Sequence, residues 1–269
     1  MDKKIIFGSG LSSHKDLKGL CQVCEVALEY GIKDYDTAPS YRTEALLSKA
    51  LSACAKKLGL NRSDYSIQTK IDPIHMYNGK VEEYFENKLK EMQLEYIDAL
   101  LIHWPLDKYL HDTWTSLVKL KEKGLTRRIG ICNLRIRHLE KLASEGITPE
   151  IVQIERHPLN TFRNEAEWCV KNDVILQDYS PLCKMHPAIR DNSCIKAIAE
   201  KYGKNTGQII LRWHIDTGAI PVFTSKSTER IKQYSELFDF KLSQGDIEAI
   251  YDINCNHKLY LESLICPGF

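Results

Sequence analysis

The sequence of 269 residues predicts a single domain, 1–269, folded as a (β/α)8 barrel, the TIM-barrel class. Short β-branched or aliphatic runs alternate with longer amphipathic segments, and no linker or low-complexity tract divides them. Several short runs, such as IDALLIHW, are apolar at consecutive positions, which is typical of parallel strands covered on both faces. Eight such strands, each followed by a helix, close most economically into a barrel.

The expected elements follow one another in strict alternation. The strands are expected at Lys4–Ser9, Ile32–Asp36, Tyr65–Lys70, Ile97–His103, Arg128–Ile131, Ile151–Glu155, Val174–Tyr179 and Ala219–Phe223. The helices are expected near Leu17–Tyr30, Glu44–Leu58, Lys80–Met92, Thr113–Lys123, Ile136–Ser144, Glu165–Lys171, Ile195–Tyr202 and Glu229–Leu237, with one more at Thr206–His214. In the first helix, Leu17, Leu20, Cys24 and Leu28 form one apolar stripe that faces inward.

An open, doubly wound sheet is the competing architecture. It usually carries a G-x-G-x-x-G nucleotide motif after its first strand, and the stretch GSGLSS does not fit that motif. The barrel is therefore favoured.

Composition narrows the class of partner. Lys and Arg number 37 and Asp and Glu 36, so a net charge of +1 gives no sign of nucleic-acid binding or of a basic membrane patch. The first apolar run is too short for a signal peptide, and no stretch approaches membrane-spanning length. We expect a soluble cytoplasmic protein, monomeric or weakly homo-oligomeric, with a small-molecule partner.

The cysteines indicate neither a disulfide framework nor a metal site. Nine scattered cysteines without an export signal are typical of free thiols in a reducing compartment. Cys21 and Cys24 form a C-x-x-C, but no second pair follows at zinc-site spacing, so core packing is the favoured interpretation. No metal is expected.

Four polar residues fall at or just beyond the ends of three neighbouring strands. Asp36 ends the second strand and Tyr41 follows on a short loop, while Lys70 and His103 end the third and fourth strands. Alone, each has a structural explanation: a turn cap, a packed ring, a solvated strand end or a core histidine. Because the carboxyl ends of barrel strands form one mouth, where chemistry occurs in this fold, we expect all four to meet there.

The set suits proton transfer to a carbonyl oxygen. A free tyrosine has a pKa of about 10, and a nearby ammonium lowers it by stabilising the phenolate. An aspartate keeps that lysine charged and fixed, and the imidazole can orient a carbonyl oxygen or pass the proton. A tyrosine in this setting can protonate the oxygen of a carbonyl group while hydride is transferred to its carbon.

The motifs YDTAPSYRTEALLSKAL, QTKI, YIDALLIHWP, RRIGICNL, VQIERHP and DYSPL resemble, in order and spacing, those of the aldo-keto reductase family. The resemblance runs from the first strand to about Asp246. It implies a barrel that binds a nicotinamide dinucleotide without a Rossmann fold and reduces aldehydes or ketones. It further implies Tyr41 as the general acid and base, with Asp36, Lys70 and His103 supporting it.

The resemblance also implies a set of cofactor contacts. Asn133 and Gln153 match residues that hold the nicotinamide carboxamide, although both also suit purely structural polar roles. Cys132 stands where the family usually has serine, and a thiol is a weaker donor. Tyr179 matches the aromatic residue that stacks on the nicotinamide, and Ser180 and Leu182 match loop positions along the pyrophosphate.

The end of the site expected to bind the adenosine departs from the family pattern. The family commonly has Pro-Lys-Ser and a later arginine around the 2′-phosphate of NADPH, but here Thr224 and Ser225 occupy the lysine and serine positions. Arg230 remains for phosphate or adenine, Lys226 offers a replacement charge, and Gln233 matches an adenine contact. NADP(H) is favoured, with NAD(H) open.

Two further departures concern the ends of the barrel. The sequence starts almost at the first strand, so the N-terminal hairpin usual in the family is expected to be lacking, and the tail after Asp246 is short. Trp104, next to His103, is expected to form one wall of the substrate site.

These residues predict an NADP(H)-dependent reductase of small carbonyl compounds. A cofactor-bound sensor with little turnover is the alternative within the same fold, although the complete set of four argues for catalysis. A barrel hydrolase or isomerase would need paired carboxylates or a metal site at the mouth, and the sequence offers neither.

Overall fold

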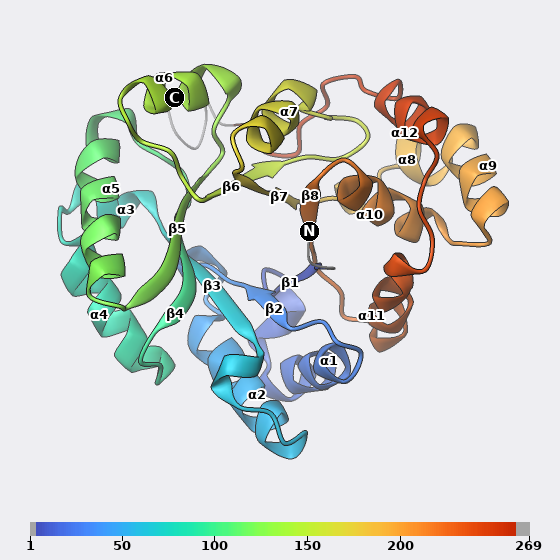
Figure 1. Cartoon of the computed structure of the whole chain (residues 1–269). Helices are drawn as coiled ribbons and strands as arrows, with labels where there is room; N and C mark the ends of the chain where they lie inside the picture. Colours follow the sequence, from blue (N-terminus) through green and yellow to red (C-terminus); the bar gives the residue numbers. More distant parts are fainter. Residues whose placement is uncertain (1–3, 262–269) are drawn as a thin grey trace.

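The computed structural model describes residues 4–261, in which eight parallel strands close into one barrel in chain order, β1 pairing with β8. Figure 1 shows the strands at the centre and the helices arranged around them. The strands are β1 Ile6–Gly8, β2 Asp34–Asp36, β3 Ser66–Ile71, β4 Ile97–Ile102, β5 Thr126–Cys132, β6 Ile151–Glu155, β7 Ile175–Tyr179 and β8 Ala219–Phe223. The predicted fold class and strand order are confirmed.

The α-helices lie on the outside of the barrel (Figure 1). They are α1 Leu17–Glu29, α2 Glu44–Lys57, α3 Pro73–Tyr77, α4 Val81–Met92, α5 Asp107–Glu122, α6 Ile136–Ser144, α7 Arg163–Lys171, α8 Pro187–Arg190, α9 Ser193–Tyr202, α10 Thr206–Asp216, α11 Thr228–Ser235 and α12 Gln244–Tyr251. Short 3-10 helices are η1 Ser12–Lys15, η2 Pro39–Tyr41, η3 Arg62–Asp64, η4 Cys183–Met185 and η5 Glu236–Phe238.

The main difference from the sequence-based expectation is the start of α5. It begins at Asp107 instead of Thr113, and its first turn already places Leu110 on the buried face that Thr113 and Leu117 continue. Asp107 in that first turn favours the helix through its charge near the positive end of the dipole. The short helices α3, α8 and α12 were not expected either.

Strand alternation decides which side chains enter the barrel. Asp36 of β2 lies opposite Gln68 of β3, and Gln153 of β6 lies opposite Gln177 of β7. Residues two apart on a strand share a face, so Gln68 and Lys70 enter the barrel together. The interior therefore carries a polar layer directly below the mouth.

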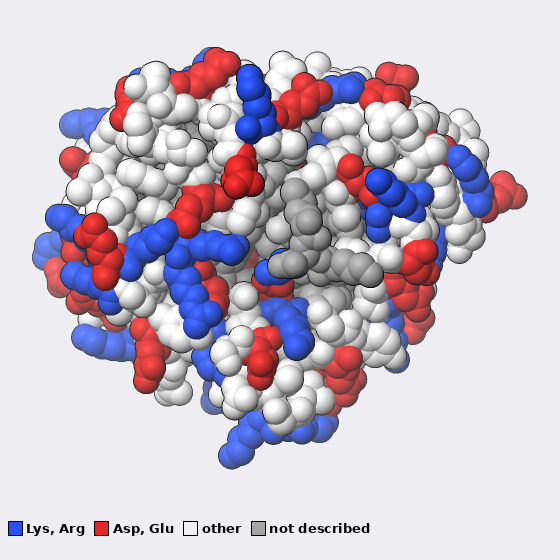
Figure 2. Space-filling view, in the orientation of Figure 1, with Lys and Arg blue, Asp and Glu red and all other residues white. Residues whose placement is uncertain are grey.

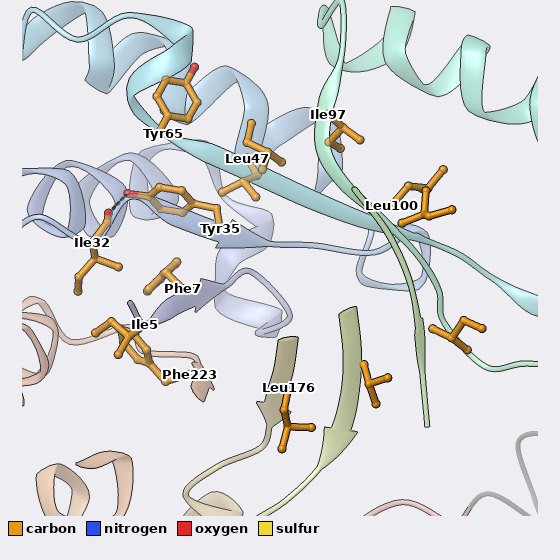
Figure 3. Packing of buried hydrophobic residues seen from close by; sticks show 14 of the residues in the cluster. Ile5, Phe7, Ile32, Tyr35, Leu47, Tyr65, Ile97, Leu100, Leu176 and Phe223 are labelled. Atoms are coloured by element: carbon orange, nitrogen blue, oxygen red, sulfur yellow. Dashed lines mark hydrogen bonds between the residues drawn. The ribbon is translucent and has the colours of Figure 1, made fainter. Parts of the chain in front are cut away.

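The main hydrophobic core lies between the strands and the helices around them. Figure 3 shows Phe7 between Tyr35 and Phe223, three rings from three different strands, and Leu47 of α2 belongs to the same cluster. The Tyr35 hydroxyl lies within this core and donates a hydrogen bond of 2.9 Å to the carbonyl oxygen of Ile32. Cys24 is fully buried in the same cluster and Cys21 packs against it, as core packing of the C-x-x-C requires.

The barrel floor contains a cavity of about 190 Å³, lined by side chains that include Asp34, Gln68, Arg128 and Gln177. Beside it, Asp98 accepts hydrogen bonds from Arg62 at 2.7 Å and Arg127 at 3.2 Å. Within residues 4–261 no hairpin precedes β1. Acidic and basic side chains are interspersed on the face shown in Figure 2, as the near-zero net charge leads one to expect.

None of the helices between residues 4 and 261 is both long and apolar enough to span a membrane.

Gly130 of β5 tests how tightly the strands are packed. A Cβ there would overlap the carbonyl oxygen of Ile151 and lie 2.7 Å from Cδ2 of Leu101. We expect Gly130→Ala to lower the free energy of unfolding by about 1–3 kcal/mol, measured by urea denaturation, because backbone atoms cannot move aside.

The matched control is Gly245→Ala on the exposed surface of α12, where the nearest atom to a new Cβ is Ser243 Oγ at 4.0 Å. This control is expected to leave stability unchanged or raise it by up to about 1 kcal/mol. Equal stability of the two variants would show that the barrel relaxes at β5.

Candidate active site

A buried ion pair stands at the centre of the mouth. The Lys70 ammonium lies 2.8 Å from each carboxylate oxygen of Asp36 and donates a third hydrogen bond of 3.0 Å to the carbonyl oxygen of Thr37. Both side chains are almost completely buried. Burial opposes the charged form of Lys70, but the Asp36 carboxylate raises its pKa above the ordinary value. The lysine is therefore a permanent cation.

Tyr41 ends η2 beside this ion pair. The Lys70 ammonium lies 5.0 Å from the centre of the tyrosine ring, and the ring is partly exposed at the mouth. Loss of water around the phenol raises the pKa of Tyr41 to about 12, although the Lys70 charge lowers it. The expected direction of the lysine effect is therefore right, but burial outweighs it. Tyr41 consequently holds its proton at neutral pH.

His103, directly after β4, completes the predicted set of four. Its ring meets the Tyr41 ring edge to face, with centroids 5.9 Å apart, and the Trp104 ring lies 6.1 Å away. Its Nδ1 lies 2.5 Å from a carboxylate oxygen of Asp72, a residue that the sequence interpretation missed. Burial lowers the pKa of His103 below its ordinary value against the opposing effect of Asp72.

Three glutamines form a hydrogen-bonded layer beneath the ion pair. Gln68 and Gln177 exchange two amide hydrogen bonds of 2.8 and 2.9 Å, and Gln153 donates one of 2.8 Å to Gln177. Gln68 and Gln153 also donate to Asp36, at 2.7 and 3.1 Å. The carboxylate of Asp36 is thus fixed from below as well as by Lys70.

The residues expected at the nicotinamide follow β5, β6 and β7. Asn133 adopts a positive φ of 62°. Its amide nitrogen donates a hydrogen bond of 2.8 Å to the His103 carbonyl oxygen, and its amide oxygen accepts one of 2.8 Å from the Tyr179 hydroxyl. Gln153 turns its amide nitrogen toward Asp36, and its oxygen lies 3.9 Å from the Cys132 thiol. Cys132 is fully buried, with no exposed surface for a ligand, whereas Tyr179 is partly exposed.

The loop after β7 has an unusual backbone. Ser180 has a positive φ, and Cys183, Lys184 and Met185 form a left-handed turn with φ of 46°, 51° and 54°. Such conformations cost about 1–2 kcal/mol per non-glycine residue and occur often at functional sites. The expected pyrophosphate contacts Ser180 and Leu182 lie on this loop and are partly exposed.

A C-terminal strap, residues 257–260, crosses this loop. The Glu155 carboxylate accepts hydrogen bonds of 2.6 and 3.0 Å from the amides of Leu259 and Tyr260. The Tyr260 ring meets Tyr179 edge to face, with centroids 5.8 Å apart, and Lys184 lies 5.2 Å from it. The strap thereby supports the ring that is expected to stack on the nicotinamide.

The residues expected at the adenosine end lie on the loop after β8 and on α11, which carries Arg230 and Gln233. Thr224, Lys226 and Arg230 are exposed, and neither cation makes an ion pair within residues 4–261. The Ser225 hydroxyl is occupied locally, since it donates to the Ser227 carbonyl oxygen and accepts from the Ser227 amide. The side-chain oxygen of Gln233 accepts a hydrogen bond of 3.0 Å from the Asn205 amide nitrogen.

The described residues contain no cluster of His, Cys, Asp or Glu suited to a metal. Three groups were missed from the sequence: Asp72 at the mouth, the Gln68–Gln177 pair beneath it, and the strap, residues 257–260, that Glu155 holds. Gln68 and Gln177 did leave a signal, since each is an uncharged polar residue within a predicted strand, at a position that alternation places inside the barrel. Asp72 lies only two residues after Lys70, which was also visible.

Comparisons with known proteins identify the family of this chain. The model of the aldo/keto reductase family matches residues 4–254, and the chain belongs to that family. The methylglyoxal reductase DkgA of Yersinia pestis is 38% identical over 236 residues, which cover 87% of this chain and 83% of the relative. The glyoxal reductase of Bacillus subtilis is 32% identical over 255 residues, covering 94% and 90%.

A solved structure is also similar. The aldo-keto reductase of Bombyx mori in complex with NADP superposes with a TM-score of 0.88 at 28% identity, covering 96% of this chain and 91% of that one.

The glutamine layer can be tested by stability. Gln68→Leu keeps the approximate volume but removes one donor from Asp36 and both hydrogen bonds that Gln177 exchanges with Gln68. We expect the free energy of unfolding to fall by about 1–3 kcal/mol, because buried polar groups lose their hydrogen bonds. The exposed Gln22→Leu on α1 is the control, with a change below about 0.5 kcal/mol in denaturant titration. A Gln68→Leu variant as stable as wild type would contradict the role of the layer.

Proposed function

We propose that this protein reduces small aldehydes and ketones with NADPH, and that Tyr41 donates the proton. The observation that carries the proposal is the contact of a protonated phenol, a permanent ammonium and an imidazole at one barrel mouth. The relatives named methylglyoxal reductase and glyoxal reductase support small aldehydes with an adjacent carbonyl group as the substrate class. Trp104, partly buried beside His103, is the proposed wall of the substrate site.

The described residues fit a nicotinamide dinucleotide. The partly exposed Tyr179 ring offers a stacking surface, and its hydroxyl bonds to the Asn133 amide. Gln153, the other proposed carboxamide contact, has its amide nitrogen on Asp36. Ser180 and Leu182 offer a loop edge for the pyrophosphate. Thr224, Ser225, Lys226, Arg230 and Gln233 lie around the proposed adenosine site, where the two exposed cations suit a 2′-phosphate.

The bound cofactor would supply hydride to the carbonyl carbon. As the oxygen gains negative charge, the Tyr41 hydroxyl gives it a proton, and the Lys70 ammonium stabilises the resulting phenolate. Asp36 and the glutamines below it hold Lys70 in place, so this charge is arranged before the reaction begins. The reverse steps oxidise an alcohol.

A cofactor-bound sensor remains the second candidate, because binding alone would use Tyr179 and Arg230. Titration with NADPH and NADH, followed by tryptophan fluorescence, measures binding, and the same sample is then assayed with glyoxal, methylglyoxal and simple aldehydes and ketones. Binding with turnover supports the reductase. Binding without turnover on every substrate favours the sensor, and absence of binding contradicts both.

Replacing the proposed acid is the direct test of the mechanism. Tyr41→Phe keeps the ring but removes the hydroxyl, so we expect kcat for reduction to fall by about 100- to 10,000-fold while the Kd of NADPH stays unchanged. Tyr30→Phe, at the exposed end of α1, is the control and should keep wild-type kcat. Substantial kcat in Tyr41→Phe would remove this phenol from the reaction.

The proposed 2′-phosphate contact is tested by cofactor preference. Arg230→Ala should raise the Kd of NADPH by about tenfold or more, a loss of about 1.4 kcal/mol, and change that of NADH much less. Arg127→Ala removes the same charge at the barrel floor and should affect neither. Equal losses for the two cofactors in Arg230→Ala would indicate adenine stacking instead.

A further inference from the structure

The contact between Asp72 and His103 joins the ends of two neighbouring strands. Asp72 follows β3 directly and His103 follows β4 directly, and their side chains are 13% and 11% exposed. Asp72 occupies the N-cap position of α3, yet its side chain makes no capping hydrogen bond. The carboxylate is directed to the imidazole instead of stabilising its own helix.

The charge states of the two groups decide where the imidazole proton lies. Burial disfavours the Asp72 carboxylate, but the His103 hydrogen bond and the nearby Ser40 amide hold the pKa of Asp72 below its ordinary value. An ionised carboxylate only accepts hydrogen bonds, so the ring nitrogen facing it must carry a proton. That nitrogen is Nδ1, at 2.5 Å.

The other ring nitrogen is thereby defined. Burial lowers the pKa of His103, so the ring is neutral at neutral pH and Nε2 carries a lone pair. No hydrogen bond reaches Nε2 from any described residue between 4 and 261. The ring lies edge to face with Tyr41, next to the proposed proton donor.

We propose that Asp72 is a positioning residue that holds the proton of His103 on Nδ1, so that Nε2 accepts a hydrogen bond in the neutral ring and donates one only in the imidazolium. This inference rests on the proposed carbonyl reduction at the mouth. In reduction, the neutral ring accepts from the hydroxyl of the alcohol product. The imidazolium instead donates to the carbonyl oxygen alongside Tyr41.

A dependence of reduction on pH follows from this arrangement. Burial and Lys70 lower the pKa of His103, whereas Asp72 and Asp36 raise it. Among residues 4–261, the Tyr41 phenol also packs against the ring. Below the pKa of His103 the imidazolium adds a second donor, so kcat/KM for reduction rises as pH falls through that value. Removing the Asp72 charge lowers this pKa, and the rise then moves to lower pH.

Nitrogen-15 NMR of histidine-labelled protein bound to NADP tests the tautomer without turnover. The His103 signals are assigned by their loss in His103→Asn. We expect the neutral ring of the wild type to show a protonated Nδ1 and an unprotonated Nε2. A proton on Nε2 in the neutral wild-type ring would overturn the proposal, even if the protein proves to be an active reductase.

The functional consequence is measured as the pH profile of kcat/KM for reduction of methylglyoxal. In Asp72→Asn the low-pH rise should move down by about one pH unit or more, because a contacting opposite charge is lost. Asp72→Glu should restore most of the wild-type profile. Asp107→Asn, an exposed carboxylate in the first turn of α5, should leave it unchanged.

An unchanged midpoint in Asp72→Asn, with Nδ1 still protonated, would contradict the positioning role. These outcomes are separate from the test of the proposed function, because the tautomer is observed whether or not the protein turns over a substrate.

Discussion

The buried ion pair between Lys70 and Asp36 is the constraint on which the mouth depends. Taking two charges out of water costs several kcal/mol per ion, and the cost is offset only when geometry and additional hydrogen bonds are good. Here the Asp36 carboxylate accepts hydrogen bonds from Lys70, Gln68 and Gln153. The Lys70 ammonium also donates one to the Thr37 carbonyl oxygen. The glutamine layer can therefore be understood as the support that allows this charge to remain in the barrel.

Burial at the mouth also sets the protonation states of the neighbouring Tyr41 and His103. It raises the pKa of Tyr41 and lowers that of His103, so at neutral pH the phenol keeps its proton and the imidazole is neutral. Lys70 remains positive because of Asp36. A site with one permanent cation beside a protonated phenol is prepared for negative charge on a bound oxygen, and it needs no rearrangement of charge when the oxygen reacts.

Features that repeat along the chain were predictable from the sequence. The eight strands were visible as apolar runs, and the rule that parallel strand ends meet at one mouth placed Asp36, Tyr41, Lys70 and His103 together. The proximity of these four follows from topology alone, because each lies at or just after a strand end.

Contacts that depend on side-chain direction were not predictable in the same way. Asp72 was not singled out from the sequence, and only the structure shows its carboxylate on His103. The Gln68–Gln177 pair joins residues 109 apart in sequence, and Glu155 holds the strap 104 and 105 residues farther on. The buried position of Cys132 likewise depends on the barrel register, in which it lies opposite Gln153.

The central claim is that a nicotinamide cofactor bound at this barrel mouth transfers hydride to the carbonyl carbon of a substrate. Isotope transfer tests this claim most directly. NADPH carrying deuterium on both positions of nicotinamide C4 would be mixed with protein and methylglyoxal, and the product analysed by mass spectrometry. The account predicts an alcohol that gains one deuterium on the former carbonyl carbon, in proportion to the cofactor oxidised. Binding of the cofactor without deuterated alcohol from methylglyoxal or from a panel of simple aldehydes and ketones would contradict it.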